Sequence, residues 1–387
     1  MTSTAATSNM NAPNIDKGLA NTVAAETQLS FIDGNAGVLE YVGIDIDTLA
    51  RNATFEETIF LLWNRRLPRR TELEALERQL RGEYDIAPGM HEIVRALPRT
   101  ASPMHALRTL VSALALHDPE ADDDSASANQ RKAVRLVAKT PTLIAAFDRH
   151  RKGVPFVAPD ATANIATNFL HMLNGAAPTA AMAKALDVCL ILHADHGLNA
   201  STFAARVTIS TLSDLYSAMT TAIGTLKGPL HGGANEEVMV MLKEIGSPSN
   251  IEPYIRGKLA RKERVMGFGH RVYKTYDPRA TYLRTFAKQV ATDTGNLPLY
   301  EMSRAIEEIM ASEVAAKGIF PNVDFYSATT YHSLGLPLDL FTPMFAMARM
   351  PGWLGHCIEQ LVDNKLIRPR ADYTGPHGVR WVAMADR

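Results

Sequence analysis

The sequence has little of several features that would narrow its function at once. Cysteine occurs only at Cys189 and Cys357, far apart and without CxxC spacing. Neither a disulfide framework nor a thiolate metal site is expected, and a reducing, cytoplasmic setting fits best. No apolar run approaches the length of about 18 residues that a membrane-spanning helix needs. The chain is therefore expected to be soluble.

The sequence also has no excess of positive or negative charge. The 40 Lys and Arg residues nearly balance the 41 Asp and Glu residues, and the formal net charge is −1. No overall field would attract nucleic acid or an anionic membrane surface, so neither is an expected partner. An anionic ligand would have to be recognised by local arginines.

Targeting signals are missing from the first sixteen residues, which are rich in Ser, Thr, Ala and Asn and contain no Arg or Lys. A secretory signal needs a basic start and an apolar stretch, and a mitochondrial presequence needs arginines. We expect residues 1–16 to form a flexible tail. The whole chain of 387 residues, with 46% hydrophobic and 21% charged residues, has an ordinary globular composition. Its length predicts two or three domains, or one large core with a satellite.

Helix signals dominate the pattern along the chain. Strand-like runs at 28–32 and 38–42, separated by a turn, predict one small β-hairpin. The acidic stretch 118–124 is expected to be a solvated loop. Helix starts are predicted by capping-box spacing at Thr54 and Glu57 and at Thr71 and Glu74, and by Ser102-Pro103. Further helices are predicted at 132–147, 163–173 and 179–192. The predicted fold class is all-α.

Reactive side chains are concentrated in four short stretches next to glycines and helix ends. These stretches are HADHGLN at 193–199, GPLHGGAN at 228–235, GFGHR at 267–271 and PNVDFYS at 321–327. Glycine beside a histidine allows the backbone to approach a ligand and leaves the imidazole accessible. One such histidine is more often structural, but three of them favour a ligand site.

A metal site is one hypothesis for the first stretch. His193 and His196 are three residues apart, so they could bind a divalent metal if Asp324 came close. The alternative is that one of the two histidines satisfies buried backbone near the helix end. No HExxH pattern accompanies the pair, and we expect no metal.

Arginines supply a second signal. Arg279 follows Asp277-Pro278, and Arg349 lies in an apolar context, where a guanidinium must be paired. Its partner could be a protein carboxylate or a small di- or tricarboxylate ligand. Histidines, one carboxylate and carboxylate-binding arginines suit proton abstraction next to a carbonyl, followed by attack on a second carbonyl. The sequence has no G-x-S-x-G elbow and no P-loop that would favour another chemistry.

At these residues the sequence resembles the citrate synthase family, in particular its shorter, dimeric bacterial and archaeal members. The resemblance runs from about Gly18 to about Gly378. The stretches that carry it are GPLHGGANEEV, MGFGHRVYKTYDPRA, PNVDFYSA and RPRADYTGP. It implies an almost wholly helical fold, with a large domain formed by residues 17–232 and 336–387 and a small domain at 233–335. One departure is Val42, where relatives commonly continue Arg-Gly-Tyr after the tyrosine.

The resemblance implies that Asp324 abstracts a methyl proton from acetyl-CoA. His231 would then hydrogen-bond the enol oxygen, and His270 would polarise and protonate the ketone of oxaloacetate. The residues implied to bind oxaloacetate are His196, Arg279, Phe345, Arg349 and Arg368. Of these, Arg368 would be donated across the interface of a homodimer, a role for which Arg370 competes. The residues implied to contact CoA are Val265, Met266, Gly267, Phe268, Gly269, Lys274 and Asn322.

Citrate synthase activity without a metal or redox cofactor is the resulting expectation. The nearest alternative is a 2-methylcitrate synthase using propionyl-CoA, since one methylene changes discrimination by only about 1 to 3 kcal/mol. Two rivals from other classes are a metal-dependent hydrolase and a helical binding protein that keeps a carboxylate pocket.

Overall fold

The structure, a computed structural model, describes residues 15–19, 21–270 and 272–387. The described residues form two compact units. Residues 27–366 make up the folded body, whereas the described residues before 27 and residues 367–387 belong to a second unit. The predicted tail falls mainly on residues 1–14, outside the described residues.

A small antiparallel sheet opens the body. Its strands are β1 (Ser30–Asp33), β2 (Val38–Tyr41) and β3 (Ile44–Asp45), in the order β1-β2-β3. The hairpin β1-β2 was predicted, but β3 was not. Val42 and Gly43 form the two-residue turn before β3, with φ of 52° and 78°. Positive φ at both positions is the signature of a type I′ hairpin turn, so the unusual Val42 lies at the point where the third strand turns back.

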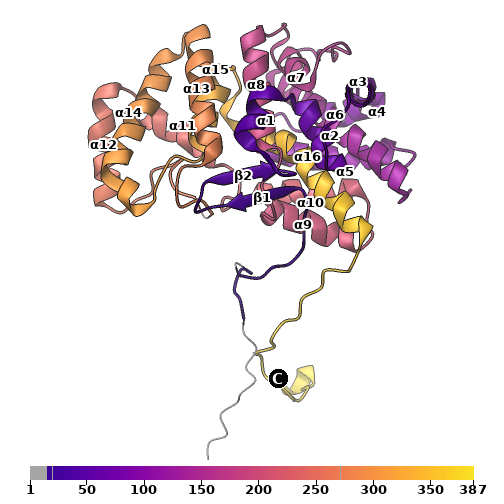
Figure 1. Ribbon diagram of the computed structural model, residues 1–387. Coiled ribbons are helices and arrows are strands. Elements are labelled where there is room, and N and C mark those ends of the chain that lie inside the picture. The colour runs from indigo at the N-terminus through magenta and orange to yellow at the C-terminus, as the bar shows by residue number, and fades with distance from the viewer. Residues whose placement is uncertain (1–14, 20, 271) are drawn as a thin grey trace, which may run out of the picture. The chain divides into compact units, whose positions relative to one another are not determined.

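Helices make up the rest of the body, which confirms the all-α prediction (Figure 1). In chain order they are α1 (Ile46–Asn52), α2 (Phe55–Asn64), α3 (Arg70–Gly82), α4 (Pro88–Ala96), α5 (Pro103–Leu114), α6 (Ala126–Lys152), α7 (Ile165–Asn174), α8 (Ala180–His193), α9 (Ala200–Ser210), α10 (Leu215–Leu226), α11 (Ala234–Ile245), α12 (Ile251–Ala260), α13 (Pro278–Asp293), α14 (Leu297–Val314), α15 (Val323–Ser333) and α16 (Phe341–Val362). Among the helices of the described residues, none is long and apolar enough to cross a bilayer.

One of the two predicted capping boxes is correct. At the start of α2, Thr54 Oγ1 accepts from the backbone N–H of Glu57, and Glu57 accepts from that of Thr54. The box predicted at Thr71 and Glu74 is wrong. Helix α3 begins two residues earlier, because the Glu72 carboxylate accepts from the backbone N–H of Arg69 at 2.8 Å.

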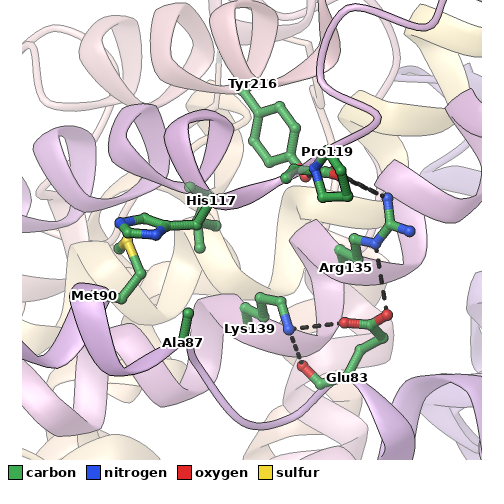
Figure 2. Close-up of a pocket in the computed structure, with 10 residues that line it drawn as sticks. Glu83, Ala87, Met90, His117, Pro119, Arg135, Lys139 and Tyr216 are labelled. Atoms are coloured by element: carbon green, nitrogen blue, oxygen red, sulfur yellow. Dashed lines mark hydrogen bonds and ion pairs between the residues drawn. The ribbon is translucent and has the colours of Figure 1, made fainter.

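The acidic stretch after α5 is only partly solvated, contrary to the prediction. The Asp118 side chain is 3% exposed, accepts from Arg135 at 3.0 Å and from the Tyr216 hydroxyl, and lines a pocket of about 230 Å³ (Figure 2). Glu83 binds Lys139 at 2.8 Å in the same pocket. An ion pair with Arg135 of α6 and a hydrogen bond from Tyr216 of α10 therefore hold Asp118 in place.

Helix α16 runs through the core of the body. Every residue from Phe341 to Met344 and from Ala346 to Cys357 is buried, and Trp353 is completely inaccessible. The helix packs against α2, α6, α8, α9 and α10. Because the helix is enclosed, a polar group on it can find a partner only inside the protein, and the indole N–H of Trp353 has none among the described residues.

Helices α11 to α15 follow one another along the chain and pack largely among themselves. They occupy the range in which the inserted small domain was predicted, and α13 and α15 also contact α8. Arg279, in the first turn of α13, acts electrostatically on His193 at the end of α8, and the ring of Tyr331 of α15 lies 6.4 Å from that of His193.

Candidate active site

Two of the predicted histidines lie side by side. His196 follows the end of α8, and its ring centroid lies 5.4 Å from that of His270. The Tyr273 hydroxyl lies 3.1 Å from His196 Nε2, and the two rings are 5.6 Å apart. Tyr273 was not predicted as a site residue. Its position three residues after His270, in the GHRVYK stretch, is the only sequence signal that it offered.

The tautomer of His270 follows from its neighbours. Its Nδ1 accepts from the backbone N–H groups of Val272 and Tyr273, at 3.0 and 3.2 Å. The ring proton of the neutral form therefore resides on Nε2. Burial and the nearby Arg279 lower the pKa of His270 to about 4. The residue is thus a neutral N–H donor at physiological pH, suited to polarise a carbonyl oxygen.

His231 lies on the glycine-rich connection between α10 and α11. Its Nε2 lies 2.8 Å from Ser201 Oγ and 3.3 Å from the backbone N of Ser201, in the first turn of α9. At Gly232 a Cβ atom would come within 2.1 Å of the Leu226 carbonyl oxygen. Only glycine fits there, which explains the residue beside the histidine.

Asp324 is a carboxyl group whose pKa is held near neutrality. It lies in the first turn of α15, where Asn322 caps the helix by accepting from the backbone N–H of Asp324 at 3.0 Å. Burial raises its pKa to about 6, although the positive charges of Arg279 and Arg349 oppose this shift. A carboxylate of this kind can accept a proton from a weakly acidic C–H group.

Arg279 is buried and already paired. Its guanidinium forms a bidentate ion pair with Asp277, at 2.9 and 2.8 Å. Asp277 also accepts from the backbone N–H of Val323 at 3.1 Å, and so ties the start of α13 to the start of α15. Burial alone would lower the pKa of Arg279, but Asp277 raises it above its ordinary value.

Arg349 is buried and has no carboxylate partner in the part of the chain that the structure describes. Its Nε donates to the His193 carbonyl oxygen, and its guanidinium lies 4.7 Å from the centroid of the Phe345 ring. Among the described residues, no carboxylate oxygen lies within 4.0 Å of it. Burial lowers its pKa to about 10. This cation can receive a carboxylate from a ligand.

The stretch predicted to contact CoA lies beside the start of α15. The Gly267 carbonyl accepts from the backbone N–H of Asn322 at 2.9 Å, and the Gly269 carbonyl accepts from its side-chain amide at 2.9 Å. Gly267 and Gly269 have φ of 80° and 82°, which favours glycine. Of the other residues predicted there, Val265 is buried, Met266 and Phe268 are partly buried, and the backbone N–H of Lys274 donates to the Gly34 carbonyl in the β1-β2 turn.

His193 has a structural contact, as the alternative to metal binding predicted. Its Nδ1 lies 2.7 Å from the Cys189 carbonyl oxygen, to which it donates, and burial lowers its pKa to about 3. In the part of the chain that the structure describes, no group of three or more His, Cys, Asp or Glu side chains could hold a metal ion.

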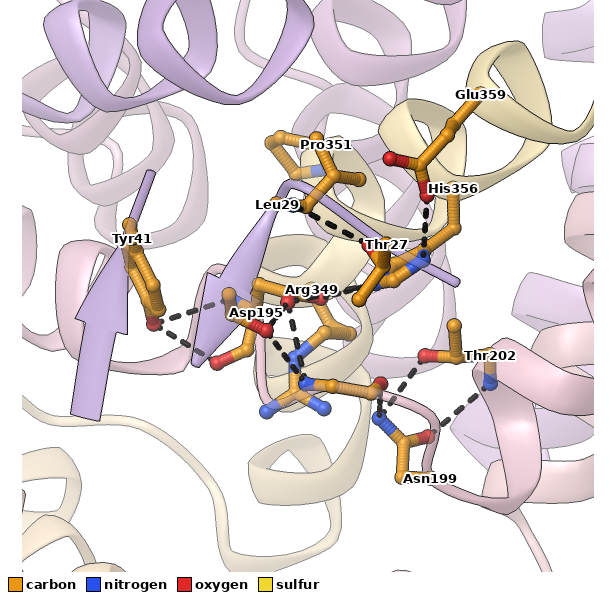
Figure 3. Close-up of polar contacts among 12 residues, drawn as sticks. Thr27, Leu29, Tyr41, Asp195, Asn199, Thr202, Arg349, Pro351, His356 and Glu359 are labelled. Atoms are coloured by element: carbon orange, nitrogen blue, oxygen red, sulfur yellow. Dashed lines mark hydrogen bonds and ion pairs between the residues drawn. The ribbon is translucent and has the colours of Figure 1, made fainter. Parts of the chain in front are cut away.

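The segment that carries His196 is fixed by residues that were not predicted. The Tyr41 hydroxyl donates to the Asp195 carbonyl at 2.9 Å and accepts from the Asp195 backbone N–H at 3.1 Å. Figure 3 shows Tyr41 and His356 on opposite sides of Asp195. These contacts join residues about 150 or more positions apart, so no local pattern indicates them.

Arg368 lies in the second unit, and its role remains a prediction. Of the other predicted residues, His196, His270, Arg279, Asp324 and Arg349 lie close enough together to interact electrostatically, whereas His231 contacts Ser201. The charge of Arg279 acts on His196, His270 and Asp324, and the charge of Arg349 acts on His196 and Asp324.

Comparisons with known proteins show the family to which the chain belongs. The family model described as citrate synthase, C-terminal domain, matches residues 18–370. Citrate synthase 2 of Bacillus subtilis is 54% identical, with 96% of this chain and 99% of the relative covered. The citrate synthase of Haloferax volcanii is 49% identical, with 96% and 99% covered. A 2-methylcitrate synthase of Mycobacterium tuberculosis is more distant, at 43% identity, with 96% and 95% covered.

The fold is similar to that of solved structures as well. One is the ternary complex of the Thermoplasma acidophilum citrate synthase with carboxymethyl coenzyme A and oxaloacetate. It has a TM-score of 0.90 at 34% identity, with 97% of this chain and 100% of the other covered. The chain therefore belongs to the citrate synthase family of acyltransferases.

Proposed function

We propose that this protein condenses acetyl-CoA with oxaloacetate and hydrolyses citryl-CoA to citrate and CoA, the first reaction of the tricarboxylic acid cycle. One observation carries the proposal. The near-neutral carboxyl of partly buried Asp324, the N–H donor of partly buried His270 and the buried cation of Arg349 are close together, since Arg279 acts on both Asp324 and His270 and Arg349 acts on Asp324. Among the described residues, Arg349 has no carboxylate partner. Each of the three groups supplies something that the condensation needs.

In the proposed mechanism, ionised Asp324 removes a proton from the methyl group of acetyl-CoA. His231 hydrogen-bonds the thioester oxygen while the enol forms. The enol carbon then attacks the ketone of oxaloacetate, and His270 donates the Nε2 proton to the developing alkoxide. Water finally cleaves the thioester and releases CoA. No step requires a metal or a redox cofactor, because the substrates supply both the carbon acid and the electrophile.

Oxaloacetate would be held by complementary charge. Arg349 offers a buried cation that has no carboxylate partner among the described residues, and Arg279 offers a second guanidinium. Phe345 packs against the Arg349 guanidinium, and both arginines act on His196, so Phe345 and His196 would line the site. We further propose a homodimer in which a second copy of the chain supplies Arg368, with Arg370 as the competing residue. The match of RPRADYTGP to the family motif supports this assignment.

CoA is proposed to bind along Val265 to Gly269, with Lys274 meeting a phosphate and Asn322 lying near the pantetheine. Positive φ at the two glycines supports this, since it lets the backbone approach a ligand. Residues 233–335 are proposed to act as a small domain that closes over oxaloacetate and excludes water until condensation is complete. The two buried, free thiols of Cys189 and Cys357 support a cytoplasmic location.

The alternative substrate is propionyl-CoA, because a more distant relative is named 2-methylcitrate synthase. A single added methylene is a small difference for a pocket to reject. Measuring kcat/KM for acetyl-CoA and propionyl-CoA with oxaloacetate separates the two functions. A clear preference for propionyl-CoA would replace citrate by 2-methylcitrate as the product.

The main test is thiol release from acetyl-CoA, which we expect only when oxaloacetate is present. Asp324→Ala should still bind oxaloacetate, while turnover should fall by about 10⁴-fold because the base is missing. Asp293→Asn, on the exposed end of α13, is the control and should keep wild-type turnover. Unchanged turnover in Asp324→Ala contradicts the assignment of the base. Loss of wild-type activity with a chelator would favour the metal-dependent hydrolase, and absence of any thiol release would favour a binding protein.

A further inference from the structure

Three successive turns of α16 face three consecutive residues of the HADHG segment. Arg349 donates to the carbonyl oxygen of His193. One turn later, a Cβ atom at Gly352 would come within 2.2 Å of the Ala194 carbonyl oxygen and within 2.7 Å of Asp195 Oδ1. One turn further, His356 Nε2 is hydrogen-bonded to Asp195 Oδ2 at 3.4 Å and lies 3.3 Å from Oδ1. The helix therefore follows the segment in register up to the residue before His196.

The tautomer of His356 is fixed by an arginine. His356 is completely buried, and its Nδ1 lies 3.1 Å from the Arg206 guanidinium. A guanidinium has donors only, so Nδ1 must be the acceptor. The ring proton is therefore on Nε2, which faces the Asp195 carboxylate.

Asp195 connects this proton to the site. Its Oδ2 accepts from Ser30 Oγ at 2.6 Å and from the backbone N–H of Gly197 at 3.1 Å. Burial would raise its pKa, but His356, Arg349 and Ser30 together lower it, so the group is a carboxylate. Asp195 and Gly197 lie directly before and after His196. The Asp195 carboxylate therefore fixes the backbone on both sides of this histidine, through its bonds to Ser30 and to the backbone N–H of Gly197.

Arg206 connects His356 to a second part of the site. It is buried in α9, donates to Glu359 at 2.9 Å and to Gln360 at 3.0 Å, and approaches the imidazole from the side opposite Asp195. The first turn of the same helix carries Ser201, which contacts His231. One imidazole thus joins α9, α16 and the segment that ends in His196.

We propose that His356 is a positioning residue for oxaloacetate binding: by donating to Asp195, it fixes the backbone on both sides of His196 and the register of that segment against Arg349. This rests on the proposed function, in which His196 and Arg349 contact oxaloacetate. His356 itself touches no substrate in this scheme. We therefore expect substitution of His356 to weaken the binding of oxaloacetate more than the binding of the acyl-CoA.

Two substitutions separate positioning from simple packing. His356→Gln places an amide nitrogen near the position of Nε2 and keeps a donor toward Asp195. His356→Asn reaches only the position of Nδ1, so it keeps a group facing Arg206 and loses the donor. We expect His356→Asn to weaken oxaloacetate binding, measured by calorimetry without acyl-CoA, by about 10- to 100-fold, and to raise the KM for oxaloacetate in parallel. His356→Gln should stay within about fivefold of wild type.

Asp195→Asn tests whether His356 acts through Asp195. In a double-mutant cycle, the variant with both His356→Asn and Asp195→Asn should bind oxaloacetate no more weakly than Asp195→Asn alone. The matched control is His150→Asn, which removes the contact of another histidine, with the Leu97 carbonyl, and should leave oxaloacetate affinity unchanged. If His356→Asn does not fold, Ser30→Ala removes another donor to the same carboxylate and is expected to weaken oxaloacetate binding.

The outcomes are distinct. Unchanged oxaloacetate affinity in a folded His356→Asn protein, equal damage in the Gln and Asn variants, or full additivity with Asp195→Asn would overturn the proposal. Absence of thiol release by the wild-type enzyme would instead refute the proposed function, and the affinities measured without acyl-CoA would still decide the role of His356.

Discussion

Two buried arginines of the site are held in opposite ways. Arg279 has a bidentate ion pair with Asp277, and that carboxylate is itself bonded to the start of α15. Arg349 has one neutral acceptor, the His193 carbonyl, and an aromatic ring, and its pKa is lowered where that of Arg279 is raised. The protein thus neutralises the charge of Arg279 with its own carboxylate and leaves the charge of Arg349 to be neutralised by a ligand.

The difference separates a structural part from a binding part. A buried charge without a partner costs free energy, and that cost is recovered when an anion arrives. Arg279 therefore connects α13 to α15 whether or not a ligand is present, while Arg349 favours the state with a bound carboxylate. The same substitution at the two positions should consequently have different effects on stability and on binding.

The largest expected effect is on catalysis at Arg349. Replacing it by Met should lower kcat/KM for oxaloacetate by about 10³-fold, because a substrate carboxylate would then be buried without its cation. At the same time, the free enzyme should become more stable by about 1 kcal/mol, since an uncompensated buried charge is removed. Steady-state kinetics and urea unfolding check the two halves. A clearly destabilised Arg349→Met protein would break the comparison.

The next effect is on stability at Arg279. Arg279→Met leaves the buried Asp277 carboxylate without its cation and should lower the free energy of unfolding by about 3 kcal/mol. Combining it with Asp277→Asn should recover part of the loss, because the orphaned charge is then gone. Urea unfolding of both variants, beside Arg349→Met, is the measurement. Equal stability changes at the two arginines would contradict the distinction.

The pH dependence of the rate should also distinguish the ion-paired Arg279 from Arg349, because both charges act on Asp324. With its pKa raised to about 6, the base is protonated at lower pH, so the rate should fall about tenfold per unit below pH 6. Asp277 raises this pKa and Arg279 lowers it. Asp277→Asn removes the negative charge that raises the pKa of Asp324 and leaves the positive charge of Arg279 uncompensated. The pKa of Asp324 should therefore fall, and the acid limb of the pH–rate profile should move to lower pH. A limb that stays in place or moves upward would show that the charges do not act on Asp324 in this way.

The smallest expected effect concerns the aromatic ring beside each arginine. Tyr273 lies 5.9 Å from Arg279 and also contacts His196, whereas Phe345 lies beside Arg349 and has no hydroxyl. Tyr273→Phe makes the two rings alike and removes the hydrogen bond to His196. Because only one hydrogen bond is lost, the KM for oxaloacetate should rise by only about fivefold. Tyr254→Phe, which removes an exposed bond to Glu244, is the control. A larger loss would assign Tyr273 a more direct role.

Local signals in the sequence predicted what depends on local structure. The capping box at Thr54, the strand turn before Val38 and the glycines beside His231 and His270 all follow from backbone geometry, and the structure has them. The grouping of the four reactive stretches came from the family resemblance, because no periodicity predicts which helix ends meet.

Long-range polar contacts were not predictable. Asp118 was interpreted as solvated because neither Arg135 nor Tyr216 is near it in sequence. His356 lies in an apolar helix, 161 residues from Asp195, and its role depends on how α16 packs against the end of α8. Such contacts arise from tertiary packing, which a hydrophobic pattern specifies only as buried or exposed.

Gly352 has a consequence for attempts to change the substrate of this enzyme. Libraries that vary Phe345 and Arg349 would naturally extend along the same helix face to the next turn. There, even alanine would force α16 away from the Ala194 carbonyl, since the space for a Cβ atom is already occupied. The movement would displace Arg349, His356 and His196 together. Position 352 should therefore be kept fixed in directed evolution, so that changes in selectivity can be attributed to the residues that line the pocket.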